Sequence, residues 1–79
     1  MARLRLFAAA REAAGTGTDT VDGHSVAAVL DAARARYGLD FGAVLDGSRV
    51  WLNGEPARYD QPVTDADEVA VLPPVSGGT

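Results

Sequence analysis

The residue types that most often perform catalysis are nearly absent from this chain of 79 residues. It contains no cysteine and only one histidine, His24. Without a thiol or an arrangement of nucleophile, base and orienting group, the sequence does not predict an autonomous enzyme. It predicts no metal site either, because thiolate ligands and a second imidazole are missing.

The stretch that could take part in chemistry is the C-terminal segment, residues 65–79. Within it, Glu68–Leu72 is a short run rich in valine, which is typical of a strand. Pro73 and Pro74 end that strand, because proline has no amide hydrogen to donate to a sheet.

The residues after the two prolines are small and end in a pair of glycines. At about 3.3 Å per residue, the chain from Pro73 to Gly78 could extend roughly 20 Å beyond the strand. We therefore expect a folded domain of residues 1–74 that presents a flexible tail, residues 75–79. A frayed terminus without function is the alternative.

Length and charge restrict the class of protein. Seventy-nine residues suffice for one domain with a thin core, and 47% hydrophobic residues are typical of a folded chain. No apolar run approaches the roughly 20 residues that cross a bilayer and no signal peptide is found, so we expect a cytoplasmic protein. The net charge of −4 disfavours nucleic acid and membrane as partners and would suit a partner with a basic docking surface.

Two elements are expected in the first third of the chain. Residues 3–7 alternate polar and apolar, which predicts a half-buried strand with Leu4 and Leu6 on one face. Residues 18–21 form a weaker strand that could pair with it as a hairpin. The segment between them is expected to contain a short helical turn and a loop.

The clearest helix begins after Ser25, a suitable N-cap. Its apolar residues follow helical spacing at Val26, Val29, Leu30, Ala33 and Tyr37. Gly38 stands where a helix commonly ends. One amphipathic helix requires one apolar surface to cover.

The second half is expected to be mostly strands. Residues 39–47 are interpreted as a connection, and Arg49–Leu52 as a strand that Asn53-Gly54 closes with a two-residue hairpin turn. Residues 56–59 are expected to return as a short edge strand, where proline is tolerated.

This order of elements predicts an α+β fold of the β-grasp type: a mixed sheet with one main helix packed on one face. The right-handed crossover through the helix would place the last strand centrally, beside the first. Alternation directs Leu4, Leu6, Val50, Leu52, Val69 and Val71 toward the helix. Phe7, Trp51, Ala70 and Leu72 then share the uncovered face, and an exposed apolar patch of this kind usually marks an interface.

Three segments resemble a known family: the helix between His24 and Gly38, the hairpin Arg49-Val-Trp-Leu-Asn-Gly-Glu55, and the ending Asp65-Ala-Asp-Glu-Val-Ala-Val-Leu-Pro-Pro-Val-Ser-Gly-Gly78. They are similar to the ubiquitin-like sulfur carriers over essentially the whole chain. The resemblance is strongest to the small subunit of molybdopterin synthase, with the thiazole-pathway carrier as a relative.

This resemblance implies that a ubiquitin-activating-type adenylating enzyme uses ATP to activate the terminal glycine, which then becomes a thiocarboxylate. The large subunit of molybdopterin synthase, or another sulfur-acceptor enzyme, would receive the tail and its sulfur. The carrier itself would bind no cofactor. Gly78 would supply the reactive carbon, with Gly77 as its necessary neighbour. The residues expected to contact partners are Phe7, Trp51, Leu72, Pro73, Pro74, Val75 and Ser76.

One residue departs from the family pattern. Active carriers end at the second glycine, whereas Thr79 follows Gly78 here. Some relatives are trimmed by a separate peptidase, so the resemblance implies that Thr79 is removed by processing. The acceptor could also belong to cysteine, thiazole or specialised sulfur metabolism. An interaction module of the same fold, which acts through the patch alone, is the alternative class.

Overall fold

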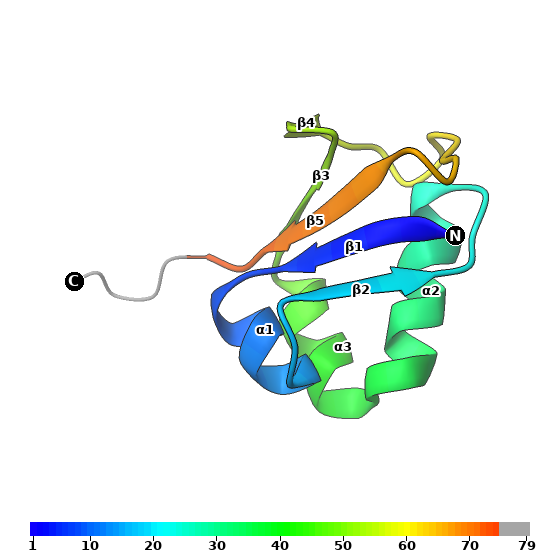
Figure 1. The fold of residues 1–79 in the computed structure, drawn as a ribbon. Coiled ribbons are helices and arrows are strands. Elements are labelled where there is room, and N and C mark those ends of the chain that lie inside the picture. The colour runs from blue at the N-terminus through cyan, green and yellow to red at the C-terminus, as the bar shows by residue number, and fades with distance from the viewer. Residues whose placement is uncertain (75–79) are drawn as a thin grey trace.

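The computed structural model describes residues 1–74 and contains a five-stranded mixed sheet (Figure 1). The strands are β1 (Ala2–Leu6), β2 (Thr18–Val21), β3 (Arg49–Leu52), β4 (Glu55–Pro56) and β5 (Glu68–Leu72). In this part of the chain the helices are α1 (Ala8–Ala14), α2 (Val26–Tyr37) and α3 (Leu39–Asp46), all on one side of the sheet (Figure 1).

The strand order across the sheet is β2-β1-β5-β3-β4. Strand β5 pairs with β1 in parallel and with β3 antiparallel, so the last strand lies at the centre. This confirms the predicted β-grasp arrangement.

Strand register explains how the core forms. Leu4 lies opposite Val69, and Leu6 lies opposite Val71. Because side chains alternate along a strand, these four point to the helices together, and all four are buried. Val50 and Leu52 pack partly buried against the same core. The predicted division of the two sheet faces is confirmed.

Helix α2 begins and ends as the sequence predicts. The Ser25 hydroxyl accepts a hydrogen bond from the amide of Ala28 at 3.1 Å, which satisfies a free donor of the first turn. At the other end, the amide of Gly38 donates to the carbonyl of Arg34 at 2.9 Å. Within residues 1–74, no helix has the length and hydrophobicity needed to cross a membrane.

Helix α2 is the longest of the three described helices, but the expectation of a connection at residues 39–47 is wrong. That segment is helix α3, in which Phe41 and Leu45 are buried. The ring of Phe41 packs against that of Tyr37, with centroids 5.2 Å apart. An ion pair of 2.6 Å between Arg34 and Asp46 also joins α2 to α3. The expected turn after β1 is likewise a full helix, α1.

The expected edge strand at residues 56–59 is shorter and begins one residue earlier, at Glu55. It pairs with β3 only through Trp51 with Pro56 and Leu52 with Glu55. The predicted turn between the two strands is confirmed, since Asn53 and Gly54 have φ values of 53° and 85°. Positive φ at both positions is characteristic of a type I′ turn, one of the two common two-residue hairpin turns.

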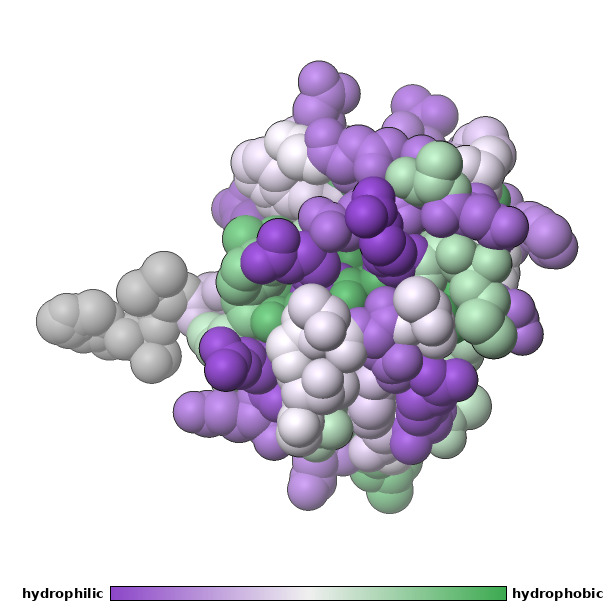
Figure 2. Space-filling view, in the orientation of Figure 1, coloured by the Kyte–Doolittle hydropathy of each residue, from purple (hydrophilic) through white to green (hydrophobic). Residues whose placement is uncertain are grey.

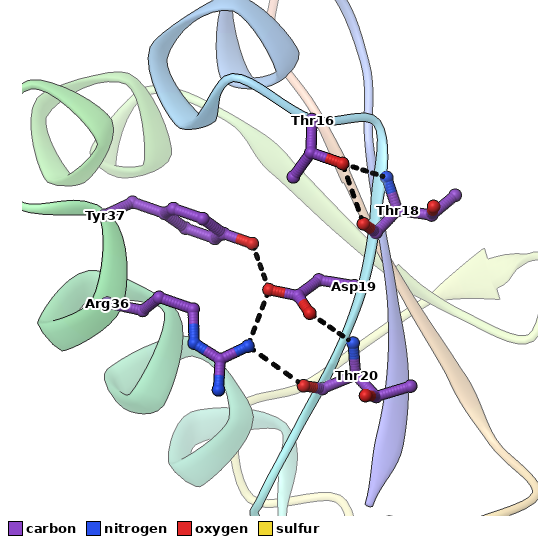
Figure 3. A network of polar contacts seen from close by, with 6 residues as sticks. All are labelled: Thr16, Thr18, Asp19, Thr20, Arg36 and Tyr37. Carbon is purple, nitrogen blue, oxygen red and sulfur yellow. Dashed lines mark hydrogen bonds and ion pairs between the residues drawn. The ribbon is translucent and has the colours of Figure 1, made fainter.

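A polar network holds the outer strand β2 to the end of α2 (Figure 3). The Asp19 carboxylate accepts hydrogen bonds from the Tyr37 hydroxyl and, at 2.7 Å, from Arg36, which also donates to the carbonyl of Thr20. The hydrogen bond from Tyr37, followed by that from Arg36, lowers the pKa of Asp19. Burial, together with the bond to Asp19, raises the pKa of Tyr37 to about 12.

Candidate functional site

The exit point of the C-terminal tail is fixed at the centre of the sheet. Strand β5 has a hydrogen-bonded neighbour on each side up to its last residues, where the amide of Phe7 donates to the carbonyl of Val71 at 3.3 Å and Leu72 lies opposite Arg49. Pro73 is half-buried and Pro74 is exposed. The tail therefore starts from a strand whose position the sheet sets.

The other end of β5 is held by a small polar cluster. The Asp67 carboxylate accepts hydrogen bonds from the amide of Thr64 at 2.8 Å and from the side chain of Asn53 at 2.9 Å. The amide of Thr64 is the main reason that the pKa of Asp67 is lowered. Asn53 also accepts from the amide of Glu68 at 2.9 Å, which joins the β3–β4 turn to β5.

The predicted partner-binding residues of the sheet come together on its uncovered face. The ladder places Trp51 opposite Ala70, and Leu72 follows two residues later on the same side. Phe7 continues β1 beside Val71, and its side chain is 38% exposed. We call Phe7, Trp51, Ala70 and Leu72 the open-face patch. Figure 2 shows apolar surface of this kind beside the end of the described chain, bordered by strongly hydrophilic atoms.

Residues Val75, Ser76, Gly77, Gly78 and Thr79 lie outside the described residues. Their expected roles in partner binding, activation and processing stay predictions. The partner-binding role of the patch residues also stays a prediction, although the structure brings these residues together.

Sequence reasoning overlooked the arginines on this face. Arg3 and Arg5 alternate with the buried residues of β1, and Arg49 lies opposite Leu72. All three are exposed. The alternation of residues 3–7 already contained the signal for the first two. The net charge of −4 therefore does not describe this face, and the expectation of a basic partner surface does not apply to it.

The described part presents a partly exposed apolar patch beside the last residues of the central strand. Within residues 1–74, no group of three histidine, aspartate or glutamate side chains gathers to hold a metal ion. No side-chain polar atom of this part is buried without a hydrogen-bond partner.

Known proteins are similar to this chain over nearly its full length. The small archaeal modifier protein 1 of Haloferax volcanii is 38% identical, over 94% of this chain and 97% of the relative. The solution structure of the protein of the same name from Methanosarcina acetivorans has a TM-score of 0.85 at 29% identity, with 98% and 95% of the two chains covered.

A third similar structure is the complex of BexX and CysO from Amycolatopsis orientalis. It has a TM-score of 0.81 at 19% identity and covers 99% of this chain and 100% of that chain, which shows the shared fold alone. The family model of the ThiS family matches residues 4–78. The chain therefore belongs to the ThiS family, among the ubiquitin-like sulfur carriers.

Proposed function

We propose that this protein carries sulfur as a thiocarboxylate on Gly78, and that the acceptor is the large subunit of molybdopterin synthase. The observation that carries the proposal is the extent of the family match, which includes both terminal glycines and ends at Gly78, one residue before the end of the chain. The resemblance of the Pro-Pro-Val-Ser-Gly-Gly ending to the molybdopterin branch supports this acceptor over cysteine, thiazole or specialised sulfur metabolism.

The chemistry needs a partner because a carboxylate is inert toward sulfur nucleophiles at neutral pH. An adenylating enzyme would let an oxygen of the Gly78 carboxylate attack the α-phosphate of ATP, which forms an acyl-adenylate and releases pyrophosphate. A sulfur nucleophile then displaces AMP. Activation thus divides one difficult substitution into two easier steps.

The described residues support a carrier that other proteins bind. The open-face patch gives a partner an apolar surface to bind, and β5 fixes where the tail departs. Glycines without a Cβ atom could enter a narrow channel in the partner and adopt φ values closed to other residues.

Thr79 provides the test of this proposal. One extra residue displaces the terminal carboxylate by about 3.5 Å, and errors near 1 Å already cost about 100-fold in rate. We therefore expect the full chain to be inactive with the adenylating enzyme, ATP and a sulfur donor until a peptidase removes Thr79. A chain that ends at Gly78 should support ATP–pyrophosphate exchange and gain the mass that replaces one oxygen with sulfur.

The controls separate the carrier from its alternatives. Gly78→Ala in the trimmed chain should impair activation without changing the fold, since the added methyl group would hinder entry into a narrow channel of the partner. Thiocarboxylate formed on Thr79 itself would show that trimming is unnecessary. If neither form supports pyrophosphate exchange, the interaction module is the better description.

The name of the Haloferax volcanii relative favours a second candidate, a protein modifier. In that function the activated Gly78 would be captured by an amine of a target protein instead of by sulfur. Intact-mass analysis distinguishes the two, because a conjugate has the summed mass of both proteins minus water.

A further inference from the structure

The uncovered face of the sheet has a charge opposite to that of the whole molecule. The chain has seven arginines and no lysine, with a net charge of −4. Arg34, Arg36 and Arg58 form ion pairs. By contrast, Arg3, Arg5 and Arg49 form no ion pair with any residue that the structure describes, and the ladder directs all three to the uncovered face. The acidic residue that the ladder places beside them is Glu68.

Two of these arginines border the open-face patch from opposite sides. In the β1–β5 ladder Arg5 lies opposite Ala70, and its guanidinium carbon is 5.3 Å from the centre of the Phe7 ring. In the β5–β3 ladder Arg49 lies opposite Leu72. The apolar residues Ala70 and Leu72 of the central strand therefore lie between two arginines, one on each neighbouring strand.

The uncovered face is also hollowed next to Arg5. An open depression of about 450 Å³ crosses β2, β1 and β5. Arg3 and Arg5 line it together with the exposed threonines Thr18 and Thr20, and Glu68 lies at its β5 side. A side chain that projects from a partner could enter this depression, where two guanidinium groups would favour a carboxylate.

We propose that the open-face patch docks on a protein surface that has an apolar centre bordered by carboxylates, and that Arg5 and Arg49 select this surface. The inference rests on the proposed function, and of the two partners named there we assign this surface to the adenylating enzyme. A second copy of the chain fits poorly, because both faces would bring their arginines together. A nucleic acid fits poorly too, because the rest of the molecule is strongly acidic.

The absence of lysine permits a direct binding assay. The α-amine of Met1 is the only primary amine of the chain, so an amine-reactive dye labels this one position. Met1 precedes Ala2, whereas the patch lies toward the end of β5, and the two strands are parallel. The dye therefore lies at the opposite end of the sheet from Leu72 and the tail exit. Fluorescence anisotropy of the labelled chain then reports binding of the adenylating enzyme without requiring chemistry.

We expect Arg5→Gln and Arg49→Gln each to weaken binding about ten-fold at low ionic strength, the equivalent of about 1.4 kcal/mol. Salt should weaken binding of the wild type, and each variant should lose part of this dependence because it lacks one steering charge. Arg58→Gln is the control, since Arg58 pairs with Asp60 and lies outside the strands that carry the patch. It should bind as the wild type does. In a charge-reversal test, single surface carboxylates of the enzyme are changed to arginine and tested with the Arg49→Glu variant. One of these enzyme variants should restore binding.

Three outcomes would overturn the proposal: variants at both arginines that bind like the wild type, wild-type binding that does not respond to salt, or a labelled chain that binds single-stranded DNA through the same arginines. Pyrophosphate exchange, measured separately, distinguishes this failure from failure of the carrier function. Exchange with unchanged binding of the variants removes the docking inference alone. Binding that requires the arginines without any exchange removes the carrier chemistry alone.

Discussion

Leu6 and Phe7 are neighbours in the sequence whose side chains point to opposite faces of the sheet, so their truncation to alanine should give opposite results. Leu6 is 2% exposed and belongs to the core, whereas Phe7 is 38% exposed and belongs to the open-face patch. Comparing the two variants separates a contribution to folding from a contribution to docking. The residues are adjacent on the backbone, and their side chains point in opposite directions.

The structure sets the expected magnitudes. Leu6→Ala leaves a cavity between the sheet and the helices and should cost about 3 kcal/mol of unfolding free energy, within the usual range of about 2–5. Phe7→Ala removes a ring that is partly in water and leaves no closed cavity. Its cost should be about 1–2 kcal/mol, which includes the loss of the contact with Arg5.

Thermal unfolding and partner binding are the two measurements. For a domain of this size, 1 kcal/mol changes Tm by about 4–8 °C, so Leu6→Ala should lower Tm by roughly 12 °C or more, and Phe7→Ala by clearly less. Phe7→Ala should weaken binding of the adenylating enzyme by about 2 kcal/mol, or roughly 30-fold, if it anchors the interface. Leu6→Ala should leave binding per folded molecule unchanged.

The reasoning would be refuted if Phe7→Ala destabilised the domain as much as Leu6→Ala did and left binding per folded molecule intact. Trp51→Ala provides an independent check from another strand, and it should behave as Phe7→Ala does.

Three further predictions concern stability. Gly23→Ala should cost about 3 kcal/mol or more, because φ at Gly23 is +156° and an added Cβ would lie 2.7 Å from the amide nitrogen of Val29; a variant with wild-type Tm would contradict this. Asp19→Asn should cost about 1–2 kcal/mol at neutral pH, since the carboxylate accepts from Arg36 and Tyr37. Folding lowers the pKa of Asp19, so the ionised carboxylate stabilises the folded state fully above the unfolded pKa of about 4. This stabilisation disappears as the pH falls through the pKa of the folded state. Denaturant titrations at several pH values should therefore show the two proteins converging in acid, and a constant difference would argue against the network. Removal of residues 75–79 should leave Tm nearly unchanged, because the buried core that the structure describes lies between Ala2 and Val71; a loss above about 2 kcal/mol would show that the tail is packed.

The sequence alone determined the elements whose signals are local. Alternation predicted β1, the cap at Ser25 and the apolar stripe predicted α2, and Asn53-Gly54 predicted the hairpin, since each depends on neighbouring backbone and side-chain geometry. The terminal glycines and the resemblance that they support were also readable without a structure. Helix α3 was missed although Phe41, Val44 and Leu45 have helical spacing, because a helix of eight residues with an internal glycine gives a weak local signal.

Only the tertiary structure decided which side chains meet across strands. The length of β4 depends on how far its ladder with β3 extends, which no local pattern specifies. The convergence of Arg5 and Arg49 on either side of Ala70 and Leu72 depends on a parallel and an antiparallel register between segments more than 15 residues apart in the sequence. A one-residue shift of either register would send these charges to the other face, so the charge of the docking surface follows from strand pairing and not from composition.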